Sequence, residues 1–186
     1  MADEKHASPT KVTTPKFLFT LKDMGFESTV KGFETHAEVF EWGLDSHCYS
    51  APQVSGTFAQ QEPPSSGPMY MRIPLGLHMP KLIKAMISKK AIKTGQLVML
   101  ASINNTNTPV MEIDLDNITV EEVLLGNNIH GRSNKNNRQL DNNFDNSFEI
   151  MLRFGKIEWR YIAFGQDGGK KGKDATGLNL MTGEME

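Results

Sequence analysis

Apolar and polar residues alternate with a period of two along much of the chain. Between residues 148 and 163 the large apolar side chains fall on every second position, with one interruption at Gly155. The same alternation recurs in residues 17–21, 69–73 and 111–115. Strands of an antiparallel sheet that bury one face show this pattern. Roughly seven such strands predict a mainly β fold, a small antiparallel β-barrel or sandwich.

Two further segments, residues 36–49 and 95–103, are predicted strands with less regular alternation. Residues 80–90 break the pattern, because their apolar positions recur at helical spacing. These positions are Leu82, Ile83, Met86 and Ile87. Pro80 suits a first helical turn, so we expect one α-helix here that packs its apolar stripe against an end of the barrel.

The chain is long enough for a single domain with its own core. We expect that domain over residues 16–186, preceded by a flexible polar arm at residues 1–15. Within it, residues 50–68 are rich in proline and predict an extended loop. Residues 126–147 form an asparagine-rich insert, and residues 165–186 predict a C-terminal hairpin or tail.

The composition excludes several classes of function. The formal net charge of −2 gives no electrostatic basis for binding nucleic acid or an anionic membrane. Cys48 is the single cysteine, so no internal disulfide can form. The first sixteen residues lack the apolar stretch of a secretory signal, and no later run is long enough to span a membrane. We therefore expect folding in the cytoplasm and, if the protein is exported, export in the folded state.

The glycine- and lysine-rich segment after residue 164 follows a strand, as a phosphate-binding loop does. The sequence does not match the motif of such a loop. Asp167 occupies the position of its first glycine, and Asp174 occupies the position of its Ser or Thr. An aspartate there removes the magnesium-binding hydroxyl and adds a charge that repels phosphate. We expect a hairpin turn with solvated lysines and no nucleotide cofactor.

Metal and catalytic motifs are also incomplete. Asp141, Asn143 and Asp145 begin like a calcium loop, but Asn146 replaces its glycine and Leu152 its glutamate. The histidines are scattered and lack the spacing of zinc ligands. No nucleophile-elbow sequence is present, and the strand carboxylates alternate with core residues, as on a solvated sheet face. We expect no metal, no cofactor, no catalytic residue and hence no enzyme.

The order of the segments resembles the haemolysin-coregulated protein family, the tube-forming components of bacterial type VI secretion systems. The similar stretches include ETHAEVFEWGLDSHCYSAP at 34–52 and GPMYMRIPLGLHMPKLIKAMISKKA at 67–91. QLVMLASI, PVMEIDLDNITVEEVLLG and FEIMLRFGKIEWRYIAFG follow in family order, and Phe154 to Tyr161 is the most specific match. The similarity covers roughly residues 16–182. The arm, the long insert and Asp45-Ser46-His47 in place of a Trp-Ser-Trp depart from it.

The resemblance implies a structural subunit of the type VI inner tube. Identical copies would close into homohexameric rings, and the rings would stack into a tube that a contractile sheath expels with a spike at its tip. The implied partners are therefore the chain itself, sheath and spike proteins, and effectors carried in the lumen. The protein would be cytoplasmic when assembled and secreted without a signal peptide.

Two sets of residues are candidate sites under this interpretation. Asp45, Ser46 and His47 would face the lumen, because they align with the family's long strand. Exposed loops are the natural source of contacts between stacked rings. The residues predicted to form the ring-stacking contact are Ser50, Ala51, Pro52, Gln53, Val54, Ser55, Gly56, Thr57 and Phe58.

Two alternatives remain open from the sequence. One is a tube protein of a phage tail or of an extracellular contractile injection particle, built on related architecture. The other is a monomeric β-sandwich module that binds sugars or another protein. Gene neighbourhood separates the first from the secretion system, and the oligomeric state separates the second.

Overall fold

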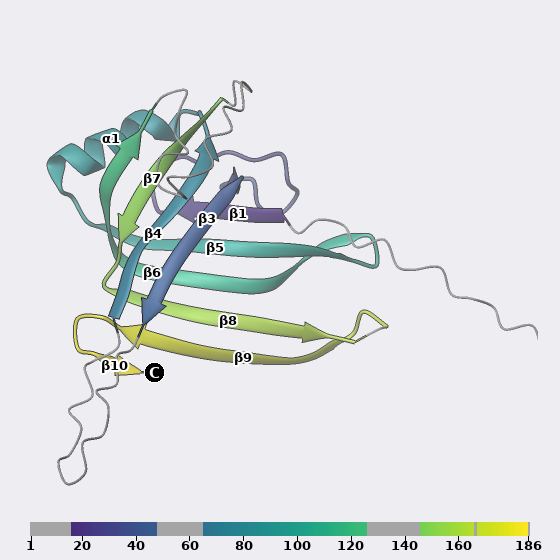
Figure 1. Cartoon of the computed structure of the whole chain (residues 1–186). Coiled ribbons are helices and arrows are strands. Elements are labelled where there is room, and N and C mark those ends of the chain that lie inside the picture. The colour runs from purple at the N-terminus through teal and green to yellow at the C-terminus, as the bar shows by residue number, and fades with distance from the viewer. Residues whose placement is uncertain (1–15, 48–64, 126–145, 166, 186) are drawn as a thin grey trace, which may run out of the picture.

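The computed structural model describes residues 16–47, 65–125, 146–165 and 167–185. These residues form ten strands and one helix (Figure 1). In chain order the elements are β1 (Lys16–Leu21), β2 (Ala37–Val39), β3 (Glu41–His47), β4 (Ser65–Pro74), α1 (His78–Ser88), β5 (Ile92–Ile103), β6 (Thr106–Leu124), β7 (Ser147–Arg153), β8 (Lys156–Phe164), β9 (Lys170–Asn179) and β10 (Glu184–Met185).

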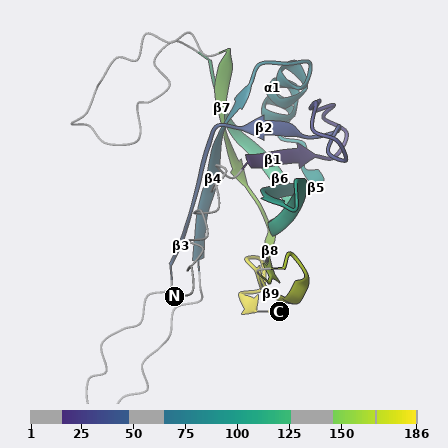
Figure 2. The same ribbon diagram turned by 90° about the vertical axis from the view of Figure 1, so that its right-hand side faces the viewer.

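The strands form two antiparallel sheets that share β6. The first sheet has the order β2–β1–β5–β6–β8–β9–β10, and the second has the order β3–β4–β7–β6. Figure 1 shows the strands of the second sheet crossing those of the first at a steep angle. Figure 2, a side view, shows the β3–β4 pair on one side and β8 and β9 at the bottom on the other. The chain is therefore an orthogonally packed sandwich.

Strand β6 passes from one sheet to the other at Asn117. Its residues 111–116 pair with β8, and its residues from 119 onward pair with β7. Asn117 has a φ of 54°, in the left-handed region that asparagine tolerates better than most residues. The Gly155 N–H, at the β7–β8 turn, donates to the Asp116 carbonyl over 3.0 Å. One local break in the extended backbone thus turns the long strand and sets the crossing of the two sheets.

The core lies between the sheets and follows the predicted alternation. Met69, Met71 and Ile73 of β4 are fully buried against strands of the first sheet. Helix α1 closes one end of the sandwich with Leu82 and Ala85 in the same cluster. Its predicted range, 80–90, is confirmed within two residues at each end.

A smaller cluster lies on the opposite, outward face of the first sheet. Leu18 of β1 with Val98 and Leu100 of β5 point outward and are nevertheless buried. The segment between β1 and β2 covers them with Val30 and Phe33. Among the described residues, this covering extends over the β1–β5 half of the outward face only.

The predicted fold class, mainly β with one helix in an antiparallel barrel or sandwich, is confirmed, and the sheet does not close into a barrel. Two predicted boundaries are wrong. The strand expected at 36–49 is divided at Phe40 between the two sheets, and β4 begins at Ser65, within the range expected to be a loop. In the C-terminal segment, expected to be a hairpin or tail, the ten-residue strand β9 pairs with β8.

The glycine-rich segment itself forms the predicted hairpin turn. The Gly165 N–H donates to the Gly169 carbonyl over 2.8 Å, and Gly168 has a φ of 78°. Strand β9 follows the turn, so no helix begins at this point that could receive a phosphate at its N-terminus. The lysines extend along the strand on exposed positions.

Candidate functional site

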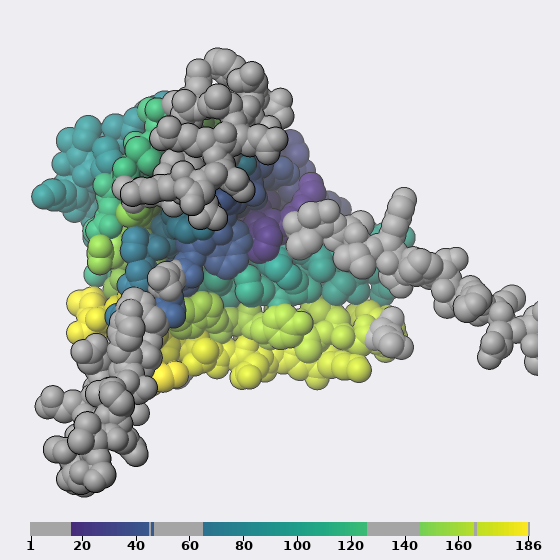
Figure 3. Space-filling view, in the orientation of Figure 1, coloured from purple at the N-terminus to yellow at the C-terminus, as the bar shows by residue number. Residues whose placement is uncertain are grey.

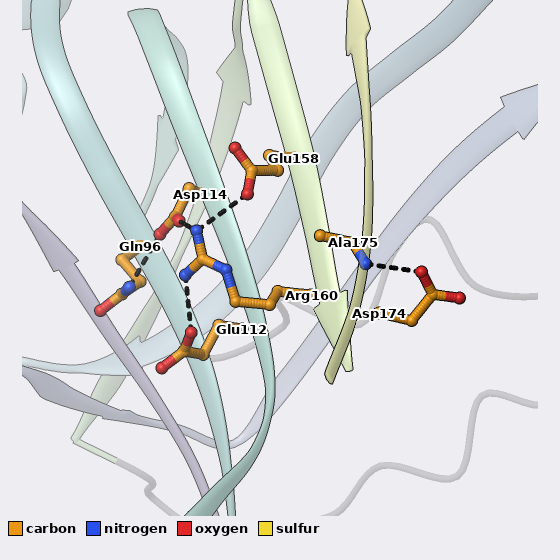
Figure 4. Close-up of polar contacts among 7 residues, drawn as sticks. All are labelled: Gln96, Glu112, Asp114, Glu158, Arg160, Asp174 and Ala175. Atoms are coloured by element: carbon orange, nitrogen blue, oxygen red, sulfur yellow. Dashed lines mark hydrogen bonds and ion pairs between the residues drawn. The ribbon is translucent and has the colours of Figure 1, made fainter. Parts of the chain in front are cut away.

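A network of charged side chains occupies the outward face of the first sheet over β6 and β8. Arg160 of β8 donates to Glu112 of β6 over 2.6 Å and to Glu158 of its own strand over 2.8 Å (Figure 4). It also pairs with Asp114 over 2.8 Å, and the amide of Gln96 in β5 donates to the same carboxylate over 2.7 Å. Figure 4 shows the guanidinium centred among three carboxylates.

The sheet register creates this network. Glu112 lies directly opposite Arg160, and Asp114 lies directly opposite both Gln96 and Glu158. The hydrogen bonds that Arg160 donates to Glu112 and Glu158 raise its pKa, so this side chain stays charged. Because three carboxylates surround one guanidinium, this network carries a net negative charge. An open depression of about 430 Å³ lies beside it, lined by Thr20, Lys22, Thr94, Gly95, Gln96, Asp114, Leu115, Asp116 and Glu158.

The core-facing side of the same strands shows a gradient of burial. Three rows of directly opposed residues run from β1 to β9. The first row is buried throughout: Leu21, Gly95, Leu115, Ile157 and Leu178. The second begins buried and ends exposed: Phe19, Leu97, Ile113, Trp159 and Thr176. The third is only partly buried or exposed along its length: Phe17, Met99, Met111, Tyr161 and Asp174.

The second sheet causes this gradient by covering only part of the first. Trp42 of β3 reaches Phe17, with 5.7 Å between ring centroids, and so covers the β1 side. Tyr161 on β8 is 59% exposed although it continues the apolar row. We call Met111, Trp159 and Tyr161 the open corner. Figures 1 and 3 show β8 and β9 extending along the lower border of the molecule beyond the crossing strands.

Strand edges are also open next to this corner. Strand β9 pairs with β8 along its length, but β10 covers only Leu178 and Asn179. Within the described residues, the backbone edge of residues 170–177 has no strand partner. Strand β3 likewise pairs on one side only, with β4. Unpaired edges are surfaces to which another strand or another chain can add.

The predicted lumen-facing residues lie at the end of β3. Of Asp45, Ser46 and His47, the structure describes the side chain of Ser46 alone, and it is exposed. Its hydroxyl lies 3.2 Å from that of Ser66 across the β3–β4 pair. The predicted ring-stacking residues, 50–58, lie outside the described residues.

Sequence reasoning missed both surfaces of the first sheet. Alternation placed Arg160 on a solvated face, but its three carboxylate partners depend on the register of β6 against β8. Alternation also placed Tyr161 with the core residues, and this residue type gives no sign of exposure. The run of seven exposed residues at the start of β9, Lys170 to Thr176, was the available signal that this border projects beyond the core.

Within the described parts of the chain, no group of three or more His, Cys, Asp and Glu side chains is arranged to hold a metal ion. Helix α1, at 11 residues, is the one helix there, and it is too short to cross a membrane.

Comparison with known proteins identifies relatives of this fold. The sequence model of the family described as "Type VI secretion system effector, Hcp" matches residues 18–161. No curated protein sequence matches. Among solved structures, one described as a type six secretion system protein aligns with a TM-score of 0.77 at 13% identity, over 93% of this chain and 100% of its own.

Two further structures agree with that alignment. Hcp1 from Salmonella typhimurium aligns with a TM-score of 0.68 at 16% identity, over 94% of this chain and 100% of its own. A type VI secretion system effector from Yersinia pestis aligns with a TM-score of 0.61 at 15% identity, over 88% and 98% of the two chains. At these identities the structures establish a shared fold.

Proposed function

The chain belongs to the Hcp family of type VI secretion effectors, and from this membership we propose that it is a structural subunit of the inner tube. Identical copies close into hexameric rings, and the rings stack into a tube. A contractile sheath expels that tube with its spike and with effectors held in the lumen. The family match over residues 18–161 carries the proposal, and the chain needs no catalytic centre to perform this role.

The surface of the folded chain is suited to self-association. Within the described residues it leaves an apolar corner uncovered and leaves strand edges without a strand partner, among them those of β9 and β3. Features of this kind on a monomer favour contact with another chain, because they expose apolar area and unsatisfied backbone groups to water. A head-to-tail contact whose rotation closes produces a ring. A contact of this kind needs about 1,000 Å² or more of buried surface to be stable.

The domain organisation fits the same role. Residues 16–186 form the ring subunit, and residues 1–15 are a polar arm outside it. The part of the predicted 50–68 loop that precedes β4 makes the contact between stacked rings, with the insert at 126–147 and the C-terminal hairpin as further contributors. Assembly takes place in the cytoplasm, and the protein leaves the cell with the tube.

A polar lumen suits a tube that must hold cargo and release it. Asp45, Ser46 and His47 are one candidate lining. The acidic outward face around Arg160 is a second, supported by its network of carboxylates. Cysteine labelling of S46C and A175C, each in a C48S chain, in assembled tubes would distinguish the candidates, because Ala175 lies opposite Arg160 and a maleimide dye too bulky for the lumen labels only positions on the outside.

Negative-stain imaging and mass photometry of the purified full-length chain test the proposal. We expect rings with the mass of six 20.8-kDa chains. A monomer at all micromolar concentrations would contradict the tube and favour the monomeric binding module. Deletion of residues 50–58 should leave the rings intact and abolish their stacking; shortened chains that still form tubes would refute that assignment.

A tube protein of a phage tail or extracellular injection particle is the second candidate, because such particles need the same rings. The genes beside this one separate the two. A secretion ATPase and membrane-complex genes support type VI secretion, whereas phage morphogenesis genes support the alternative.

A further inference from the structure

We infer that the open corner and the adjoining edge of β9 are the surface on which a second copy of this chain docks, and that the second copy contributes the segment around Phe40. This inference rests on the proposed function and names the two patches that form the contact between neighbours in a ring. Each copy carries both patches, so the contact is head-to-tail.

The open corner has the composition of an interface core. Met111, Trp159 and Tyr161 continue the apolar rows of the main core, yet nothing in the described chain covers Tyr161. Aromatic residues and methionine are enriched at the centres of protein interfaces. The corner is therefore an extension of the core that is completed from outside.

The approach to this corner is unobstructed. Beyond Tyr161 the next opposed pair in the same direction is Ala163 and Gly172. A Cβ atom built on Gly172 would meet no atom within 4 Å. The edge of β9 beside it offers backbone donors and acceptors over residues 170–177. A partner can thus reach both the apolar corner and the strand edge without displacing any part of the described chain.

The charges along the edge of β9 indicate what docks there. The exposed part of β9 carries Lys170, Lys171 and Lys173, of which Lys173 lies opposite Ile162 and projects from the outward face, whereas the single carboxylate, Asp174, lies opposite Tyr161 on the face of the corner. A complementary patch therefore combines an exposed apolar side chain with carboxylates.

Such a patch lies on this chain around the junction of β2 and β3. Phe40 is 52% exposed there, with Glu38 and Glu41 on either side of it in sequence. The side chains of Glu38 and Glu41 are 44% and 42% exposed, and their ion pairs with Lys16 and Arg72 are long, at 3.6 and 3.9 Å. Both carboxylates remain accessible to the lysines of a neighbour.

The two patches lie near opposite borders of the molecule. Strand β2 ends the first sheet on one side, whereas β9 lies near its other end, with β1, β5, β6 and β8 between them. One copy cannot bring its own Phe40 patch to its own corner. A contact between the two must join successive copies, and such a contact closes into a ring when its rotation allows.

Substitutions at exposed positions test this pairing without disturbing the core. We expect Tyr161→Glu and Phe40→Glu each to reduce rings to monomers in mass photometry, with a monomer melting temperature that differs little between the two. Ile87→Glu is the matched control, because Ile87 is 73% exposed on α1 and lies outside both patches. Its rings should persist.

The decisive measurement mixes the two monomeric variants. A Y161E chain keeps an intact Phe40 patch, and an F40E chain keeps an intact corner. We expect equimolar mixtures to form dimers, and no rings, in size-exclusion chromatography with light scattering at concentrations where the wild type is fully assembled. Each variant alone should remain monomeric.

The outcomes separate this inference from the proposed function. A wild-type chain that is monomeric refutes the ring itself. Wild-type rings that survive Tyr161→Glu, or that are lost in Ile87→Glu instead, overturn the docking surface and leave the ring standing. A mixture that yields no dimer overturns the pairing of the corner with the Phe40 patch.

Discussion

The two faces of the first sheet differ over the same strands, β6 and β8. On the outward face the two terminal nitrogens of Arg160 bind three carboxylates within 2.8 Å, and its buried Nε has no partner among the described residues. On the inward face burial declines along successive rows until Tyr161 is mostly exposed. The charged groups of the outward face are therefore largely paired within the monomer, whereas the apolar inward face is incomplete.

This difference separates two kinds of exposed surface. A polar face whose groups satisfy one another costs little free energy in water and can serve as the wall of a channel. An apolar face that continues the core costs free energy for as long as it stays uncovered. The first surface is stable alone, and the second favours assembly.

The largest expected effect comes from the buried end of the inward gradient. Leu115→Ala removes a side chain that is 1% exposed, and should lower the free energy of unfolding by about 2–5 kcal/mol. Tyr161→Ala, two rows along on the neighbouring strand, should change it by less than about 0.5 kcal/mol when the chain is monomeric. Chemical denaturation below the assembly concentration measures both. Equal losses of unfolding free energy in the two variants would contradict the gradient of burial.

A smaller effect is expected on the outward face. Arg160→Met leaves Glu112, Asp114 and Glu158 without their shared cation, and should cost about 1–2 kcal/mol after allowance for solvent screening. Added salt should narrow the difference from the wild type, because it screens the repulsion that remains.

Arg153→Met is the matched control for this prediction. Arg153 has a pair as short as those of Arg160, at 2.6 Å to Glu121, but its side chain is 59% exposed and has one carboxylate partner within the described part of the chain. We expect a loss of about 0.2–1 kcal/mol. Equal losses in the two variants would show that the network around Arg160 adds nothing to a single surface pair.

The smallest expected effect concerns a polar group on the buried side. His78 stacks between Phe26 and Phe148, its ring centroid 4.5 and 5.7 Å from theirs, and its Nε2–H donates to the Pro74 carbonyl over 3.0 Å. Burial lowers its pKa from the ordinary value of about 6.5. Between the two pKa values the unfolded chain binds more protons than the folded chain.

The sign of the pH dependence follows from that difference. The stability contribution is fully present above about pH 6.5 and is lost as the pH falls toward the lowered pKa of the folded state. Thermal melting between pH 7.5 and 5 should show a declining midpoint. The decline should be shallower in His78→Gln. Part of the decline should remain in this variant, because burial lowers the pKa of His36 as well. An identical slope in the variant would refute this role of His78.

Much of the fold could be predicted because alternation is a local property. The pattern in residues 156–163 correctly assigned Ile157 and Trp159 to the inward face and Glu158 and Arg160 to the outward face. The helix at 78–88 was recognisable for the same reason, since its apolar spacing is read within a few turns. The failure came at Phe40, where one segment serves two sheets. The core-facing positions change phase there, from Ala37 and Val39 to Trp42 and Leu44, and a change of phase does not show which sheet each half joins.

The candidate site was harder to predict from the sequence than the fold. The lysines of residues 170–173 suggested a solvated turn, but the strand that carries them forms only because β8 lies beside it as a template. Neither the Arg160 network nor the exposure of Tyr161 could be predicted, since each depends on residues far apart in the chain.

The sequence by itself determined which residues form strands, which side of each strand is apolar, and the family to which the chain belongs. Only the tertiary structure decided how far the second sheet covers the first, and hence which apolar residues stay exposed. The physical reason is that alternation is set by the backbone within each strand, whereas coverage is set by the crossing of strands from distant parts of the chain. Tyr161 and Ile157 occupy equivalent positions in the alternating pattern, and the extent of that crossing alone distinguishes the surface of one from the core position of the other.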